Sequence, residues 1–428
     1  MQKNVSIFYH KIDKQKNRFL RFFKWLFISG LIGILVGLLG TAFSYGMKLV
    51  TETRETYPVI ILGLPLGGLM IVFLYRFFGM QNDAGTNSVI SAVRSEEKLH
   101  IRTAPLIFIS TLITHLFGGS AGREGAALQM GGSVGSGIGN ILHLNDTDMH
   151  VAVMCGMSAC FSALFGTPIA ATFFSMEVVS VGIMYYSALV PCVFSSLIAV
   201  EIAHFLGVES EAMTISLIPE LTVINASKTI FISIIAAMLS ITFCLLLHNT
   251  SKYTKKLFPN PYIRIASVSI MIIIIQLLTG TQDYMGAGME VIKRTMNEEV
   301  NPEAFLLKML LTALTLGIGF KGGEIVPSFY VGATFGCLAG HMLGLSPSMC
   351  AAVGMISLFC GVTNSPITSL LLAIELFGVE GIHFILIGIA VSYMLSGYHS
   401  LYDSQQIMYS KYDAQYRGQR FADLKKKK

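Results

Sequence analysis

The sequence predicts an all-α polytopic membrane protein. Two observations carry this prediction: 13% of the 428 residues are charged and 53% are hydrophobic, and the hydrophobic residues gather in long blocks. A soluble protein usually has about a quarter of its residues charged. A helix that crosses a bilayer needs about 20 apolar residues. Blocks of about this length occupy 26–50, 58–79, 186–206, 228–248, 262–280 and 379–398.

Shorter apolar runs lie between these blocks. They occupy 104–117, 149–166, 168–184, 305–320, 325–344, 350–361 and 366–378. Several are too short to cross a membrane alone. Broken or re-entrant helices are tolerated at membrane depth only where they are buried in protein or line a wet cavity. The short runs therefore predict discontinuous helices inside the protein.

The charges suggest an orientation. Residues 1–24 are polar and basic and do not resemble a signal peptide, and the chain ends in four lysines, 425–428. By the positive-inside rule we expect both termini in the cytoplasm and the protein in the cell membrane. The net charge of +5 then reflects topology, so no nucleic-acid partner is expected. Seven scattered cysteines have no metal-ligand spacing, so we expect buried thiols and no metal or cofactor.

The sequence contains an internal repeat. Segments 156–177 and 354–375 share a glycine, a proline twelve residues later and a glutamate nine residues after that. Glu124 and Glu324 lie 200 residues apart, and each opens a glycine-rich apolar stretch. Segments 79–85 and 280–288 show a weaker similarity. Three matches in the same order, at nearly the same spacing, predict two homologous halves.

The predicted organisation has four parts. A basic cytoplasmic segment covers 1–24, the halves cover 25–210 and 225–400, and a short cytoplasmic tail covers 401–428. An odd number of crossings in each half would make the halves inverted. Inverted repeats with discontinuous helices near the midplane are typical of transporters.

Several helices are predicted to begin inside the apolar zone. Thr167-Pro168 and Ser365-Pro366 each offer a hydroxyl cap followed by proline at the first helical position. A helix N-terminus attracts anions through its free amides and partial positive charge. Glycines such as Gly122 and Gly125 would let an ion touch the backbone. Helix packing through small residues is the alternative, especially for the glycines in 131–139.

Glu124 is the strongest candidate functional residue. An ionisable group inside a membrane protein is a functional hypothesis by default. Its carboxylate would compete with an anion for the same amides and would leave when protonated, which couples anion movement to a proton. Neutralisation by Arg123 is the alternative, although adjacent helical side chains do not face one another.

The motifs resemble the CLC family of anion channels and anion/proton antiporters. G-R-E-G at 122–125 matches the family's G-R-E-G-P, with Ala126 in place of proline. G-G-E-I-V-P at 322–327 matches the G-x-F-x-P region, and Tyr402 stands where the family has its pore tyrosine. The resemblance implies a CLC-type fold of two inverted repeats with tilted and discontinuous helices. It also implies a lipid-embedded homodimer with one pathway in each subunit, and we expect no CBS domain in the short tail.

The resemblance also implies a set of site residues. Glu124 would be the gating and proton-carrying glutamate, and Glu324 a second pathway glutamate. The anion-binding residues implied are Arg123, Gly125, Ile325, Val326, Ala84, Gly85 and Tyr402.

Three departures from the family pattern resemble its fluoride-exporting branch. Ala84, in D-A-G-T-N at 83–87, replaces the family's chloride-binding serine. Val178 replaces the internal proton-transfer glutamate of many chloride/proton antiporters, with Glu177 one position before it. Glu324 is an additional carboxylate. Fluoride accepts a proton far more readily than chloride, so a protonated carboxyl favours it.

The sequence therefore predicts a secondary transporter, not an enzyme, that exports cytoplasmic fluoride in exchange for inward protons. Glu124 would form the external gate, Glu324 would tune the site, and Tyr402 would line or close the inner side. A chloride/proton antiporter or chloride channel of the same family is the alternative. An intramembrane hydrolase using Ser120 of G-G-S-A-G is a remote one.

Some residues keep two interpretations. For Glu324, the alternative to a role in transport is an ion pair with Lys321 that neutralises its charge. Glu177 and Glu375 occupy equivalent repeat positions. They would serve either in capping or interface pairing, or in a proton path.

Overall fold

The computed structural model describes residues 2–94, 99–413 and 416–420, with side chains over 18–94 and 99–413. The basic side chains before Arg18 and those of the four terminal lysines are not among the described side chains. The cytoplasmic location of both termini therefore remains a prediction.

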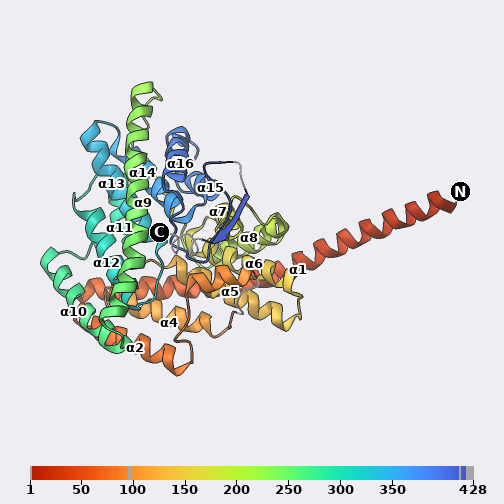
Figure 1. The fold of residues 1–428 in the computed structure, drawn as a ribbon, viewed down its shortest axis with the longest axis horizontal. Helices are drawn as coiled ribbons and strands as arrows, with labels where there is room; N and C mark the ends of the chain where they lie inside the picture. The colour runs from red at the N-terminus through yellow and green to blue at the C-terminus, as the bar shows by residue number, and fades with distance from the viewer. Residues whose placement is uncertain (1, 95–98, 414–415, 421–428) are drawn as a thin grey trace.

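Helices make up most of the structure (Figure 1). The first part of the chain forms α1 (Gln2–Thr56), α2 (Leu64–Phe77), α3 (Thr86–Val93), α4 (Thr103–Leu116), α5 (Glu124–Ile141), α6 (Asp146–Phe165), α7 (Pro168–Glu177) and α8 (Leu189–Phe205). The second part forms α9 (Val223–Leu257), α10 (Pro261–Thr279), α11 (Met289–Met296), α12 (Ala304–Ile318), α13 (Ile325–Leu343), α14 (Pro347–Thr363), α15 (Pro366–Phe377) and α16 (Ile382–Leu395). Short 3-10 turns at Pro58–Gly63 and Tyr186–Ala188 precede α2 and α8.

The helices of the two parts follow one another in the same order. Short α3 and α11, of eight residues each, are followed by α4 and α12, then by α5 and α13, in step with the sequence repeat. The boundaries of the halves and their inverted relation remain predictions.

The described chain contains six helical segments that are long and apolar enough to cross a membrane. They are Arg18–Thr56, Pro58–Phe77, Asp146–Phe165, Tyr186–Phe205, Val223–Leu257 and Pro261–Thr279. The prediction of a membrane-spanning helix over 379–398 was too long, because the helix there, α16, has only 14 residues. Gly378 and Gly381, at φ +82° and +72°, turn the chain before the helix begins. The run at 149–166 instead belongs to the 20-residue α6, whose start is capped by Asn145.

Glycines bring neighbouring helices of each part into close contact. A Cβ on Gly131 in α5 would overlap the carbonyl of Gly156 in α6. A Cβ on Gly332 in α13 would likewise overlap the carbonyl of Gly354 in α14. The packing interpretation is therefore the correct one for Gly131, in the glycine-rich stretch that follows Glu124.

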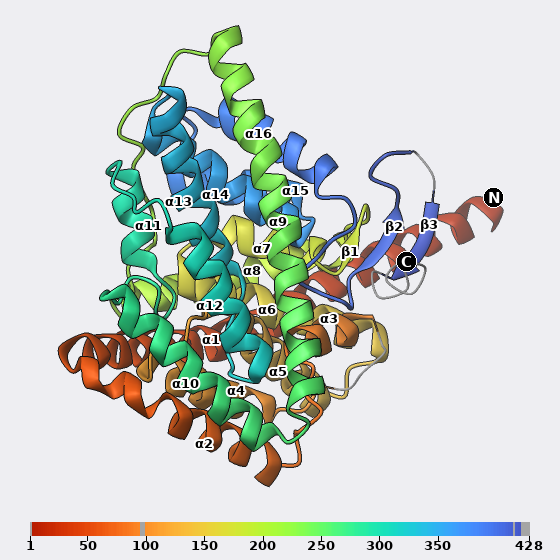
Figure 2. The ribbon, with the colours of Figure 1, turned by 60° about the vertical axis from the view of Figure 1, so that its left-hand side comes forward.

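A small sheet was not predicted from the sequence. Strand β1 (Ser180–Val181) pairs in parallel with β2 (Gln406–Tyr409), and β2 pairs antiparallel with β3 (Tyr416–Arg420). Figure 2 shows β2 and β3 beside the helical body, with β1 reaching them from the end of α7. The sheet ties the chain that follows Tyr402 to the first half.

The caps of α7 and α15 differ from the expected hydroxyl caps. Thr167 and Ser365 hold the cap positions, but neither hydroxyl makes a capping hydrogen bond. Carboxylates from the other half replace them. Glu375 accepts from the amides of Ile169 and Ala170 at 2.8 and 2.7 Å.

The reverse cap is made by Glu177. It accepts from the amides of Ile367 and Thr368 at 3.1 and 2.8 Å, and from the Thr368 hydroxyl at 2.6 Å. These bonds favour the capping interpretation for Glu177 and Glu375. A long side chain reaches the first turn of a helix in the other half better than a short hydroxyl, and its negative charge is stabilised there.

Candidate functional site

Two loops from the two parts of the chain meet at the centre of the site. One precedes α5 and the other precedes α13. Gly122 and Gly323 form an antiparallel bridge, each donating its amide to the other's carbonyl at 2.7 Å. A Cβ on Gly125 would lie 3.1 Å from the Gly322 carbonyl oxygen, and one on Gly323 would lie 2.6 Å from the Gly125 nitrogen. Glycine is required because the backbones approach so closely.

Glu124 begins α5 and points to the start of α13. Its side chain is fully buried. One carboxylate oxygen accepts from the amide of Val326 at 3.1 Å, and the other accepts from the amide of Arg123 at 3.1 Å. Negative charge is favourable at a helix N-terminus, where amides are free to donate. The carboxylate therefore occupies a position that suits an anion.

The Arg123 guanidinium forms no ion pair with the Glu124 carboxylate among the described residues. That group donates to Glu211 at 2.6 Å, and its central carbon lies 5.6 Å from the Phe165 ring centroid. The alternative of an Arg123–Glu124 side-chain pair was therefore wrong. The guanidinium anchors the loop before α5, and only the Arg123 backbone amide contacts the Glu124 carboxylate.

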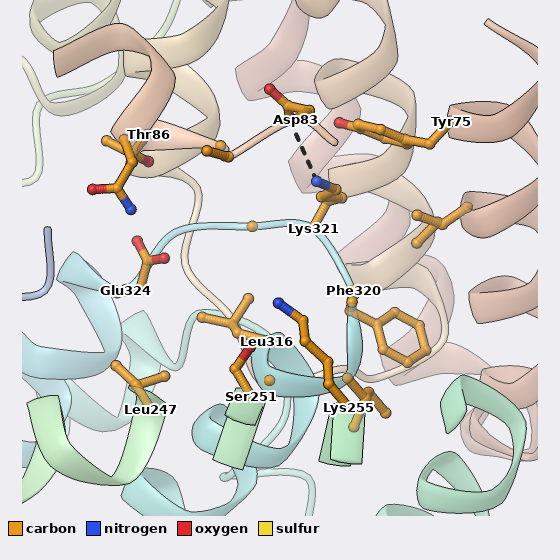
Figure 3. A pocket seen from close by; sticks show the side chains of 18 of the residues that line it. Tyr75, Asp83, Thr86, Leu247, Ser251, Lys255, Leu316, Phe320, Lys321 and Glu324 are labelled. Carbon is orange, nitrogen blue, oxygen red and sulfur yellow. Dashed lines mark hydrogen bonds and ion pairs between the residues drawn. The ribbon is translucent and has the colours of Figure 1, made fainter. Parts of the chain in front are cut away.

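Glu324 occupies the N-cap position of α13, where its side chain makes no capping hydrogen bond, and lines a cavity of about 690 Å³. Its Oε2 atom is buried and has no hydrogen-bond partner among the described residues. Lys321 pairs with Asp83 at 3.4 Å, so the alternative of a Lys321–Glu324 pair was wrong. Figure 3 shows the Glu324 carboxylate inside this cavity, with Thr86 opposite it.

The same cavity collects three more of the predicted residues. Ala84, Gly85 and Tyr402 line it. The Tyr402 side chain is buried, and its hydroxyl has no partner in the part of the chain that the structure describes. We call this cavity the Glu324 cavity.

A second cavity of about 880 Å³ contains Arg123 in its lining, together with Arg54, His115 and Glu211. We call it the Arg123 cavity. Glu124 lines neither cavity, although its neighbour Arg123 lines one and Glu324 lines the other. Ile325 and Val326 are fully buried at the start of α13 and also line neither. The buried Glu124 carboxylate thus lies outside both cavities, next in sequence to a residue that lines one and hydrogen-bonded near a residue that lines the other.

Sequence reasoning missed Gln129. It lies one turn after Gly125, lines the Glu324 cavity and donates to the Gly125 carbonyl at 3.0 Å. Its side-chain oxygen is buried without a partner among the described residues. An amide inside an apolar, glycine-rich helix was a signal that could have identified it.

The helices, the central carboxylate and the two flanking cavities define a membrane transport protein. The family described as "Voltage gated chloride channel" matches residues 67–397, and the chain therefore belongs to this CLC family. Its relatives include channels and antiporters, so it is an ion transport protein of the membrane.

Named relatives span most of the chain. The chloride/fluoride channel protein of Pseudomonas syringae pv. tomato is 32% identical over 396 residues, which are 91% of this chain and 88% of that protein. The H(+)/Cl(-) exchange transporter ClcA of Vibrio cholerae is 27% identical over 386 residues, 83% and 82% of the two chains.

Solved structures agree with this assignment. A CLC-type fluoride/proton antiporter matches with a TM-score of 0.87 and 32% identity, covering 90% of this chain and 98% of that one. A slow cyanobacterial Cl−/H+ antiporter matches with a TM-score of 0.77 and 18% identity, covering 87% and 94%, which supports the fold alone. The coarse functional class is that of a CLC anion/proton exchanger.

Proposed function

We propose that this protein exports fluoride in exchange for protons, with Glu124 as the gate and proton carrier. The observation that carries the proposal is the Glu124 carboxylate at the N-terminus of α13, held by the Val326 amide at 3.1 Å. The carboxylate and an anion would use the same donor. Protonation removes the negative charge that favours this position, so the side chain leaves and the anion takes its place.

Glu324 supports fluoride as the anion. Its buried, unpartnered Oε2 lines the cavity next to the site. A second carboxylate close to the pathway would repel an anion strongly while it is charged. Once protonated, it becomes a hydrogen-bond donor. Fluoride is a strong acceptor and chloride a weak one, so this group would favour fluoride.

The charges that line the cavities support a direction. Cationic side chains line the Glu324 cavity at positions 76, 252, 255, 264 and 321. Carboxylates at positions 52, 55, 209, 211, 283 and 290 line the Arg123 cavity, beside a smaller number of cations. Basic residues gather on the cytoplasmic side of membrane proteins. We therefore propose that the Glu324 cavity opens to the cytoplasm and the Arg123 cavity to the outside.

The remaining parts of the proposal concern assembly and location. We propose a homodimer in the cell membrane, with one pathway in each subunit and both termini in the cytoplasm. Crosslinking of the purified protein in membranes, followed by mass analysis, tests the dimer.

Reconstitution tests the choice of anion. Liposomes with the purified protein are loaded with equal concentrations of fluoride and chloride, and ion-selective electrodes record efflux of each. We expect fluoride efflux to exceed chloride efflux by at least an order of magnitude, since a missing hydrogen bond in a buried site costs about 1–3 kcal/mol. Equal rates of fluoride and chloride efflux would contradict fluoride selectivity and favour the alternative of a chloride/proton antiporter.

A further inference from the structure

Three side chains that line the Glu324 cavity form a cluster. The Lys321 ammonium lies 3.4 Å from the Asp83 carboxylate and 4.1 Å from the centroid of the Tyr75 ring. Figure 3 shows the Tyr75 hydroxyl directed towards this ion pair. Tyr75 is 5% exposed, and its hydroxyl has no hydrogen-bond partner among the described residues. The ammonium thus contacts the Asp83 carboxylate, and a buried hydroxyl donor without a partner among the described residues lies beside the same ion pair.

The cluster joins two loops that are 238 positions apart in sequence. Asp83 belongs to the loop before α3, and Lys321 belongs to the loop before α13. The related loop before α11 is fixed by its backbone: Gly286 donates to the Gly119 carbonyl at 3.0 Å and accepts from the Ala121 amide at 3.2 Å. The described residues include no such backbone bond between 79–85 and 319–323. The Asp83–Lys321 contact depends on side chains, which can exchange partners.

The chemistry of the cluster matches that of the central site. There, the Glu124 carboxylate accepts a hydrogen bond from the Val326 amide, a donor that an anion could also use. Here, the Asp83 carboxylate forms an ion pair with the Lys321 ammonium, and the Asp83 side chain is only 3% exposed. An ammonium with a nearby hydroxyl donor is a good site for a small, strongly hydrated anion, because both donors replace water.

We propose that Lys321 and Tyr75 form a docking site for a small anion in the lining of the Glu324 cavity, with Asp83 as its displaceable internal ligand. The ligand is fluoride, and this identity rests on the proposed function. An incoming anion replaces the Asp83 carboxylate at Lys321, and the carboxylate returns when the anion moves on towards Glu324.

The test compares the fluoride concentration that gives half-maximal efflux from loaded liposomes in three variants. Lys321→Met raises this concentration about tenfold, because a partly buried ammonium attracts an anion strongly. Tyr75→Phe raises it roughly threefold through one lost hydrogen bond. Asp83→Asn lowers it, because the competitor loses its charge. Lys256→Met, in an exposed lysine of α9 that does not line the cavity, leaves it unchanged.

The opposite directions of the Asp83 and Lys321 variants carry the test. If the pair only holds two loops together, both variants impair transport in the same direction, and the docking site is overturned. An unchanged half-maximal concentration in Lys321→Met also overturns it. Lys321→Arg keeps the charge and should stay near the wild type, which separates lost charge from misfolding.

The wild-type control keeps this proposal separate from the proposed function. If the wild-type protein moves chloride and not fluoride, the fluoride assignment fails. The same variants are then compared with chloride as the loaded anion. If Lys321→Met and Asp83→Asn shift the half-maximal chloride concentration in opposite directions, the docking site stands. If both shift it in the same direction, the docking site is overturned as well.

Discussion

The Glu124 carboxylate accepts a hydrogen bond from the Val326 amide at 3.1 Å, although the two residues are 202 positions apart. The contact crosses from the first residue of α5 to the first turn of α13. It depends on the Gly122–Gly323 bridge, which brings the two loops together. A carboxylate thus lies where loops from two distant parts of the chain meet. The proposed coupling of an anion to a proton depends on this contact.

Replacing the central carboxylate should uncouple transport. Glu124→Gln has nearly the same shape but cannot carry a proton. Fluoride efflux from liposomes should therefore no longer move protons, as measured by a pH electrode in the bath. Glu52→Gln, in an exposed carboxylate lining the Arg123 cavity, is the matched control and should stay coupled. Proton movement that persists in Glu124→Gln would show that another group carries the proton.

Two substitutions separate the roles of Glu324. Glu324→Ala removes the hydrogen-bond donor, so the ratio of fluoride to chloride efflux should fall about tenfold, the effect of losing one hydrogen bond in a buried site. Glu324→Gln keeps a permanent donor and should retain more of the fluoride preference. Electrode measurements of both anions give the ratio. A ratio unchanged in Glu324→Ala would remove Glu324 from the selectivity mechanism.

The carboxylate caps between the halves should contribute to stability. Glu177→Gln removes a charged acceptor from three hydrogen bonds and Glu375→Gln from two. Charged hydrogen bonds contribute about 1.5–3 kcal/mol each, so both variants should unfold at lower temperature, with Glu177→Gln more affected. Thermal unfolding in detergent measures this, with exposed Glu380→Gln as the control. If a proton path ran through Glu177, its variant would instead lose coupling at unchanged stability.

Close helix packing should make Gly131 intolerant of any side chain. Gly131→Ala places a methyl group against the Gly156 carbonyl in α6, so α5 and α6 must separate. Overpacking of this kind costs about 1–3 kcal/mol. The yield of monodisperse protein in size-exclusion chromatography should fall. Gly30→Ala in α1, where a Cβ would lie 3.7 Å from Ile198, is the control and should be tolerated.

The sequence predicted those parts of the site that local patterns encode. Glycine-rich apolar stretches and the repeat spacing identified the helices that begin near Glu124 and Glu324, and proline at helix starts identified α7 and α15. Contacts between distant side chains had no such signal. The Asp83–Lys321 pair, the carboxylate caps of Glu177 and Glu375 and the partner of Arg123 all depend on how the two parts of the chain pack.

The small sheet was also beyond sequence reasoning. Strand β1 has two residues, which is too short for an alternating pattern, and its partner β2 lies more than 200 residues later. Such short strands form because the helices bring their ends together, as at the end of α7.

The central claim is that fluoride export is coupled to proton uptake. Liposomes containing the protein are loaded with fluoride at an internal pH below that of the bath, and internal pH is followed with a trapped dye. The account predicts that the outward fluoride gradient drives protons inward, against their own gradient, and that internal pH falls further as fluoride leaves. Fluoride efflux with no uphill proton movement would contradict it.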